Sequence, residues 1–173
     1  MVERTGKFVS LLIIAGLIPF IVAAWGALRP WQLAGVLFID ESENIIALWQ
    51  MTLLVLLIYG GVIFSFLGGA RWGTALADEG EKAPSFTMFM AILPAFIATV
   101  CSIMGVSGLL FGDPLNGGVG VTLPIALYIL AAGYLILLAF DVHTTYPILY
   151  VRLRIFASLV AIACLLTGAI YAS

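Results

Sequence analysis

Five long stretches of the chain are apolar and contain no charged side chain. Each has more than 18 residues without Asp, Glu, Lys or Arg, and they cover residues 8–28, 44–70, 83–112, 114–140 and 155–173. A helix needs about 20 apolar residues to cross the hydrocarbon core of a bilayer. Because backbone polar groups in hydrocarbon need internal partners, such stretches form helices. The pattern therefore predicts an all-α integral membrane protein with five transmembrane helices.

Proline and glycine positions narrow these stretches. Pro84 suits the start of the third helix, and the glycine-rich run 112–120 is typical of a turn. We expect spans at about 8–28, 45–68, 85–109, 121–140 and 155–172. They use most of residues 1–173, so the chain is a single helical bundle. The longest connection, residues 29–44, is too short for a soluble domain. It either lies along the outer surface as an interfacial segment or is a plain loop.

Basic residues lie almost entirely on one side of these spans. On that side are Arg4, Lys7, Arg71, Lys82, Arg152 and Arg154. Arg29 is alone on the other side. Because cytoplasmic loops are enriched in Lys and Arg, we predict a cytoplasmic N-terminus and a periplasmic C-terminus. The first span also resembles a signal peptide, but its apolar run exceeds the usual core of about 7–15 residues, which favours a retained span.

The composition excludes several classes of protein. Hydrophobic residues make up 64% of the chain and charged residues 9%, against about 25% charged in soluble domains. The mean hydropathy is +1.21. These values exclude a soluble enzyme and a disordered protein. The net charge of −2 leaves no basic footprint for nucleic acid. The expected partners are the lipid bilayer and a membrane protein or a second copy of the chain.

Small residues recur at every fourth position in the second span. This stripe consists of Gly61, Ser65, Gly69 and Gly73. Lipid tails are as apolar as helix side chains, so helices in a membrane associate through close packing rather than through the hydrophobic effect. Small side chains let two backbones approach closely, and this spacing is therefore typical of a packing face. We expect the stripe at the centre of the bundle or at a contact with a partner. Since glycine weakens a helix, we expect the span to bend or end at Gly68 and Gly69.

Charged residues are absent from the middle of every span and gather at the predicted inner ends. The candidate polar cluster there consists of Arg71, Trp72, Asp141, His143, Tyr150 and Arg154. Proton pumps and ion-coupled transporters carry ionisable groups at mid-depth, so a proton relay is disfavoured. A guanidinium fork matches a carboxylate, and we expect Arg71 or Arg154 to pair with Asp141. The alternative is that each side chain reaches water alone.

The motifs do not point to a cofactor, a metal or a catalytic group. Asp141 and His143 resemble half of a metal site, but such a site needs three or four ligands. His143 and the adjacent threonine lack the spacing usual for a base and a nucleophile. Cys101 and Cys164 lie inside spans, where cysteine behaves as a small apolar side chain. We therefore expect no cofactor and favour a non-enzymatic protein.

Several short motifs along the chain are shared with a known family. They are the runs 16–20 (GLIPF), 59–61 (YGG) and 65–73 (SFLGGARWG), the pair 93–94 (LP), and Asp141 followed by Tyr150, Leu153 and Arg154. On these motifs the chain resembles, over nearly its whole length, the small membrane proteins of domain-of-unknown-function family three-four-two-nine. Leu149 and Ser158 depart from the family pattern, which has tryptophan and threonine there. The resemblance implies a bacterial inner-membrane protein related to an animal mitochondrial transmembrane protein, and it implies no activity.

Three hypotheses of function remain. The first is an accessory, scaffold or assembly factor, which suits the small size and the glycine stripe. The second is a transporter or channel for a small neutral solute. Its candidate polar path is lined by Tyr59, Tyr128, Tyr134, Thr99 and Ser102, whose alternative role is hydrogen bonding between helices. The third is a membrane enzyme, or a binder of lipid head groups, that uses Asp141, His143 and the arginines.

Overall fold

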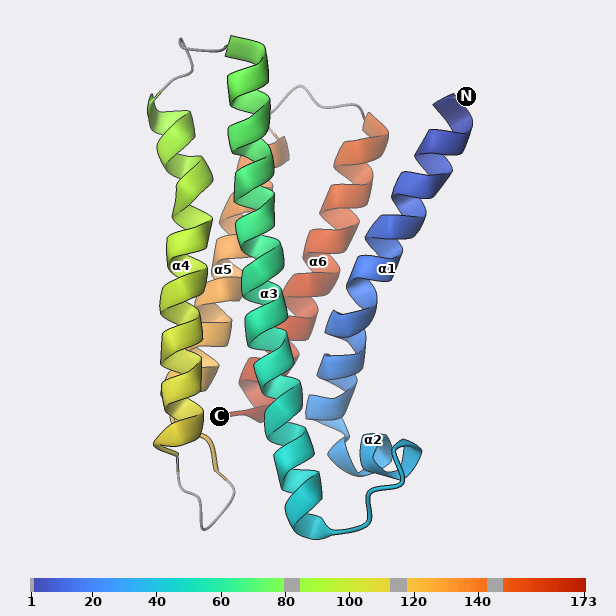
Figure 1. Cartoon of the computed structure of the whole chain (residues 1–173), viewed down its shortest axis with the longest axis vertical. Helices are drawn as coiled ribbons and strands as arrows, with labels where there is room; N and C mark the ends of the chain where they lie inside the picture. Colours follow the sequence, from blue (N-terminus) through green and yellow to red (C-terminus); the bar gives the residue numbers. More distant parts are fainter. Residues whose placement is uncertain (1, 80–84, 113–117, 143–147) are drawn as a thin grey trace.

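The computed structural model describes residues 2–79, 85–112, 118–142 and 148–173, and its regular elements are α-helices (Figure 1). They are α1 Val2–Leu28, α2 Pro30–Val36, α3 Ser42–Glu79, α4 Ser85–Leu110, α5 Thr122–Val142 and α6 Ile148–Tyr171. All except α2 contain a segment long and apolar enough to cross a membrane. The prediction of an all-α protein with five such helices is confirmed.

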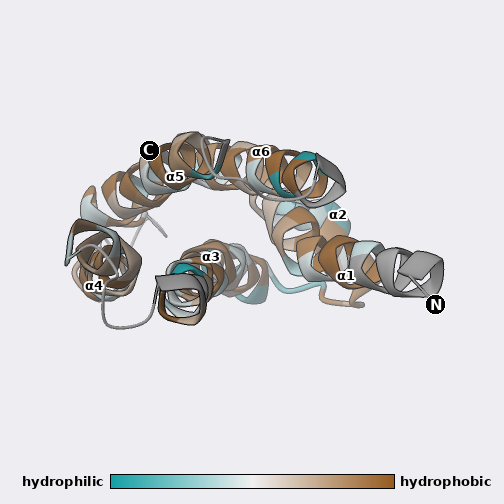
Figure 2. Cartoon of the chain, turned by 90° about the horizontal axis from the view of Figure 1, so that it is seen from above, coloured by the Kyte–Doolittle hydropathy of each residue, from teal (hydrophilic) through white to brown (hydrophobic). Residues whose placement is uncertain are grey.

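Four of the membrane-length helices form an arc, and the fifth fills its hollow. α4, α5, α6 and α1 pack in that order, each against the next, and α3 contacts all four (Figure 2). The N-terminus lies at the same end of the bundle as the C-terminal ends of α3 and α5, whereas α2 and the C-terminus lie towards the opposite end (Figure 1). The central position of α3 explains why its side chains reach every other span.

The buried core runs through the bundle and includes side chains of α1, α3, α4, α5 and α6. α3 and α5 supply most of its fully buried leucines, which are Leu53, Leu56 and Leu57 on α3, and Leu123, Leu127 and Leu130 on α5. Steps of three and four residues place side chains on one face of a helix, so each of these two helices turns one row of leucines into the core. Most large apolar side chains on the outer faces remain exposed, as expected for helices surrounded by lipid.

Two glycines of α3 lie in close contact with α4. A Cβ atom on Gly61 would lie 3.3 Å from the Cβ of Ala98, and one on Gly68 would lie 2.9 Å from the Cγ of Pro94. Gly69 and Gly73 have no such neighbour within 4 Å. The four-residue stripe is thus only partly a packing face within this chain. Because a four-residue step rotates by about 40° on a helix of 3.6 residues per turn, the stripe turns away from α4, whereas the seven-residue step from Gly61 to Gly68 stays on it.

The glycine pair does not end the helix. α3 continues through Gly68 and Gly69 to Glu79, whereas its span was predicted to end near residue 68. Of the bend or end expected at this pair, the end was wrong. Helix propensity is a weak preference that tertiary contacts override, and Gly68 is held against the backbone of α4 at Ala91.

The connection between α1 and α3 contains a short helix. α2 begins with Pro30 in its first turn and buries Leu33 and Ala34. Two residues beyond its end, Phe38 lies in the left-handed region at φ 57°. The amide of Ile39 donates to the carbonyl of Ala34, which is the closing bond of a Schellman motif. Phe38 is 91% exposed and Trp31 67% exposed. These apolar side chains suit an element that lies at the membrane interface.

Candidate functional site

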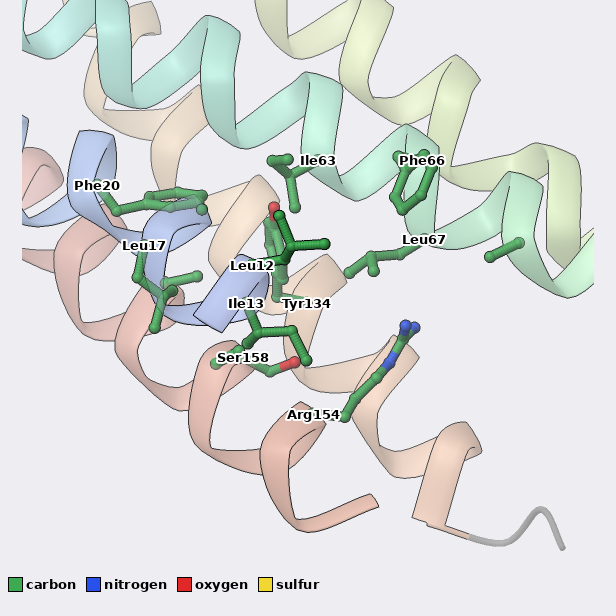
Figure 3. A pocket seen from close by; sticks show the side chains of 14 residues that line it. Leu12, Ile13, Leu17, Phe20, Ile63, Phe66, Leu67, Tyr134, Arg154 and Ser158 are labelled. Atoms are coloured by element: carbon green, nitrogen blue, oxygen red, sulfur yellow. The ribbon is translucent and has the colours of Figure 1, made fainter. Parts of the chain in front are cut away.

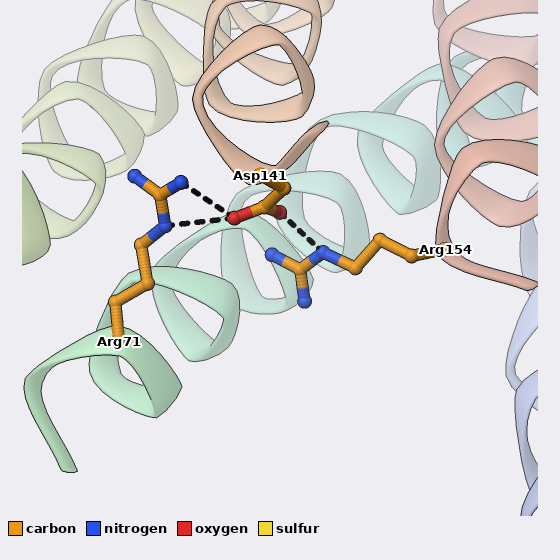
Figure 4. A network of polar contacts seen from close by, with 3 residues as sticks. All are labelled: Arg71, Asp141 and Arg154. Atoms are coloured by element: carbon orange, nitrogen blue, oxygen red, sulfur yellow. Dashed lines mark hydrogen bonds and ion pairs between the residues drawn. The ribbon is translucent and has the colours of Figure 1, made fainter. Parts of the chain in front are cut away.

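Three charged side chains from three helices meet at one end of the bundle. Asp141, near the end of α5, lies between Arg71 of α3 and Arg154 of α6 (Figure 4). Its Oδ1 accepts from Nε of Arg71 at 2.8 Å and lies 2.6 Å from Nη2 of the same residue. Its Oδ2 accepts from Nε of Arg154 at 2.5 Å. We call these residues the charged triad.

The triad is nearly excluded from solvent. The side chains of Arg71, Asp141 and Arg154 are 13%, 7% and 9% exposed, respectively. A buried charge is costly unless it is paired and hydrogen-bonded, and here each arginine binds a different oxygen of the carboxylate. The Cζ atom of Arg71 also lies 5.6 Å from the centre of the Phe140 ring, close enough for a cation–π contact. The triad therefore ties α3, α5 and α6 together at this end.

The sequence led us to expect one arginine on Asp141, and the structure places both there. Two guanidinium groups therefore share one carboxylate. This sharing could not be deduced from the sequence, because it depends on the positions of three separate helices.

Of the other members of the candidate polar cluster, Trp72 is the one whose side chain is described. Trp72 follows Arg71 and is 37% exposed, as suits an aromatic anchor at the membrane interface. His143 lies outside the described residues, and only the backbone of Tyr150 is described. Within the described residues, no group of three or more His, Cys, Asp or Glu side chains could hold a metal ion.

A groove of about 510 Å³ lies beside the triad, between α1, α3, α5 and α6. We call it the α1–α6 groove. Its apolar lining consists of Leu12, Ile13, Gly16, Leu17, Phe20, Ile63, Phe66, Leu67, Ala70, Ala157 and Ala161. Tyr134, Arg154 and Ser158 complete it. Its size falls in the range of about 300–1,000 Å³ that is usual for small-molecule sites.

The groove is apolar at one end and charged at the other. Leu17 and Phe20 lie at one end, and Arg154 lies at the opposite end (Figure 3). Ser158 is one helical turn from Arg154 towards the apolar end. This arrangement matches an amphipathic molecule, whose chain would lie among the apolar side chains and whose head group would lie at Arg154.

The inner wall of the groove is fixed by a cluster of aromatic rings. Phe20 and Tyr59 meet edge to face at 5.2 Å between centroids, and Phe64 and Tyr134 lie 5.2 Å apart. The Tyr134 hydroxyl donates to the carbonyl of Gly60 at 2.8 Å. The Tyr59 hydroxyl donates in the same way to α1, at the carbonyl of residue 16. Rings and hydrogen bonds together lock α1, α3 and α5 on this side of the groove.

Two of the five hydroxyl groups considered for a polar path bond between helices. Tyr59 and Tyr134 donate to the backbone of neighbouring helices. Thr99 and Ser102 donate to carbonyls of their own helix, α4, at 2.8 Å. Tyr128 is 42% exposed on α5. The geometry thus favours the structural role for Tyr59 and Tyr134.

Sequence reasoning missed the groove, although α6 carries a signal for it. Arg154 is followed at helical spacing by Ala157, Ser158 and Ala161, and all four line the groove. Small side chains at steps of three and four residues leave a hollow along one helix face. The hollow is recognisable only once α1 and α3 are placed opposite that face.

Comparison with known proteins identifies a family. A family model described as protein of unknown function, DUF3429, matches residues 6–170. Since the match covers nearly the whole chain, the protein belongs to this family. No curated protein and no solved structure matches the chain.

Proposed function

We propose that this member of the DUF3429 family, whose function is unknown, is a non-enzymatic accessory protein of the membrane. We further propose that it binds an amphipathic lipid in the α1–α6 groove. The observation that carries the proposal is the polarity of the groove. Its lining is apolar along most of its length and ends at the buried guanidinium of Arg154. Sites for small molecules are mostly apolar, with a few polar groups that fix orientation.

The position of the groove within the bundle supports a ligand taken from the bilayer. Its lining comes only from helices with membrane-crossing segments, so a chain in the groove would lie at the depth of lipid tails. Exposed apolar residues such as Leu12 and Phe66 lie on its lining. A lipid could therefore enter sideways without crossing a polar surface.

We further propose that the protein is a multi-pass protein of the bacterial inner membrane with a cytoplasmic N-terminus. The basic residues at the triad end of the bundle support this orientation through the positive-inside preference. The groove would then lie in the cytoplasmic half of the bilayer.

An accessory protein needs a surface for a membrane-protein partner. The α3 stripe offers one at Gly69 and Gly73, which have open space beside them.

Lipid retention tests the proposed function. The full chain is purified in mild detergent, and native mass spectrometry counts the lipid molecules that remain bound. A second sample carries Ala157→Trp, which fills the groove because Ala157 lines it. The matched control is Ala163→Trp, at an exposed position of the same helix outside the lining.

We expect one retained lipid in the wild type and in Ala163→Trp, and none in Ala157→Trp. Equal retention by all three proteins would mean that the lipid sits elsewhere on the surface. Absence of lipid from all three, also after lipid is added back, would reject the lipid-binding function.

A further inference from the structure

A hydroxyl group on the wall of the groove narrows the chemistry of its ligand. We propose that the α1–α6 groove binds a lipid whose acyl chain is attached through an ester, and that the Ser158 hydroxyl donates a hydrogen bond to the ester carbonyl. The inference rests on the proposed lipid-binding function and adds the linkage that is recognised and the residue that recognises it.

Ser158 is buried in the bundle, yet its hydroxyl is not used by the protein. The residue is 5% exposed, and its hydroxyl makes no hydrogen bond with any residue that the structure describes. Fully enclosed side-chain nitrogen and oxygen atoms of the described residues all have partners, so the Ser158 oxygen is open to the groove that its side chain lines. Because buried polar groups are nearly always hydrogen-bonded, such an exception points to a partner from outside the chain.

Other hydroxyl groups in the spans bond within the protein. Those that donate to the carbonyl four residues earlier on the same helix belong to Ser65, Thr99, Ser102 and Thr167. Such back-bonding occupies a hydroxyl that hydrocarbon would leave without a partner. The Tyr134 hydroxyl, which shares the lining with Ser158, donates to the carbonyl of Gly60. Ser158 differs from all of these because it turns its donor towards the groove.

The position of Ser158 along the groove matches the position of an ester in a lipid. It follows Arg154 by four residues on α6, which is about 6 Å along a helix that rises 1.5 Å per residue. The apolar side chains of Leu17 and Phe20 lie further along, at the opposite end from Arg154 (Figure 3). An acyl-ester lipid carries a polar head group, an ester carbonyl and an aliphatic chain in the same order.

An ester carbonyl is also the acceptor that this hydroxyl requires. A serine hydroxyl has one O–H to donate, and a carbonyl oxygen accepts well without bringing a donor of its own. An ether oxygen in the same place accepts poorly, and an aliphatic chain does not accept at all. Apolar surroundings strengthen a hydrogen bond and make an unpaired hydroxyl costly. The site should therefore distinguish an acyl ester from a lipid that lacks the carbonyl.

The test compares two neutral lipids that differ in one carbonyl group. Monopalmitoylglycerol carries its chain on an ester, and monohexadecylglycerol carries a chain of the same length on an ether, with the same head group. Each displaces a fluorescent fatty-chain probe from the full-length protein in mild detergent. We expect the ester to bind about three- to tenfold more tightly, which is the effect of one hydrogen bond between neutral groups.

Variants assign the preference to a residue. Ser158→Ala removes the hydroxyl and is expected to abolish the preference for the ester, while binding of the ether stays unchanged and reports an intact groove. Thr167→Ala is the matched control, because it removes a hydroxyl of the same helix that bonds to Ala163 and lies outside the lining. It is expected to keep the full preference.

Infrared spectroscopy tests the hydrogen bond in the wild-type protein itself. Monopalmitoylglycerol with an isotope-labelled carbonyl is bound to the protein, and its carbonyl band is compared with that of the same lipid in hydrocarbon solution. We expect a shift to lower wavenumber on binding, because a hydrogen bond weakens the carbonyl bond. An unshifted band would contradict the proposal.

The outcomes separate this inference from the lipid-binding function. If ester and ether bind equally well, ester recognition is rejected while lipid binding stands. If neither displaces the probe, both proposals are rejected. If Ser158→Ala keeps the preference for the ester with ether binding unchanged, the recognising residue is not Ser158 and the proposal is overturned. A lipid retained on purification that contains no acyl ester would overturn it as well.

Discussion

Asp141 is the residue on which this end of the bundle depends. It binds Arg71 of α3 and Arg154 of α6 with its two oxygens, so its removal would leave two arginines close together in a nearly buried place. Breaking a buried ion pair by removing one partner costs about 3–5 kcal/mol. The triad is therefore a structural requirement at this end of the bundle.

Exchanging the charges of Arg71 on α3 and Asp141 on α5 tests whether the two side chains stabilise the protein by pairing with each other. Arg71→Asp gives two carboxylates and one arginine, and Asp141→Arg gives three arginines, so each single change places like charges together. We expect each to lower the free energy of unfolding by about 3 kcal/mol or more, seen as a lower thermal midpoint in detergent and less accumulated protein. The double variant restores two arginines and one carboxylate and is expected to recover most of the loss.

Arg152→Asp provides the control for this exchange. Arg152 is exposed and lies outside the triad, and an exposed charge contributes about 1 kcal/mol or less. A double variant no more stable than the worse single variant would contradict the pairing seen in the structure.

The sequence could predict the pairing of these residues only in part. The sequence marked Asp141, Arg71 and Arg154 as candidates because charged residues are rare at the ends of apolar spans. A carboxylate near two arginines also indicates an ion pair. The sharing of one carboxylate was not recognisable, since it depends on α3 and α6 flanking α5. Nor could the sequence show that Arg154 also faces a groove.

At the scale of the helix, α3 shows how packing overrides local preference. Its adjacent glycines suggested a bend or an end of the helix, yet the helix continues to Glu79. Gly68 lies against α4 at Ala91 and Pro94, whereas Gly69 has open space beside it. Two neighbouring residues of the same type thus have opposite roles, and only the structure tells them apart.

This contrast gives a prediction with its control in the next residue. Gly68→Ala is expected to destabilise the protein by about 1–3 kcal/mol, as overpacking does, because the new Cβ would meet the α4 backbone and Pro94. Gly69→Ala is expected to be neutral or to stabilise by up to about 1 kcal/mol, the gain in helix propensity. Thermal unfolding of both variants in the same detergent measures the difference. A loss for Gly69→Ala equal to that for Gly68→Ala would indicate a contact of Gly69 that lies outside a single chain.

At the scale of the molecule, the spans were predictable and their arrangement was not. Charge-free stretches mark the spans because hydrocarbon excludes charge. The sequence does not show which face of each span turns inward. Lipid is as apolar as the core, so both faces of a span are apolar, and the helices associate through close packing. α4, α5, α6 and α1 form an arc around α3 (Figure 2). This arrangement, which also creates the α1–α6 groove, depends on close contacts between helices, such as that of Gly61 with Ala98.

The orientation of the whole bundle is the last prediction. An odd number of spans places the two termini on opposite sides of the membrane, and the positive-inside preference places the N-terminus in the cytoplasm. A C-terminal fusion to alkaline phosphatase, which is active only outside the cytoplasm, is expected to be active, and a C-terminal green fluorescent protein is expected to be dark. Fusions to a chain truncated at residue 82, between α3 and α4, are expected to show the reverse pattern.

The result bears on the ligand as well as on the topology. α6 begins at the same end of the bundle as the N-terminus (Figure 1), and its first turns carry Arg154 and the charged end of the groove. With the N-terminus inside, the groove would receive its lipid from the cytoplasmic leaflet. A fluorescent C-terminal fusion would contradict the charge-based orientation. The groove would then face the periplasmic leaflet, and its lipid binding would have to be tested with lipids supplied from that side.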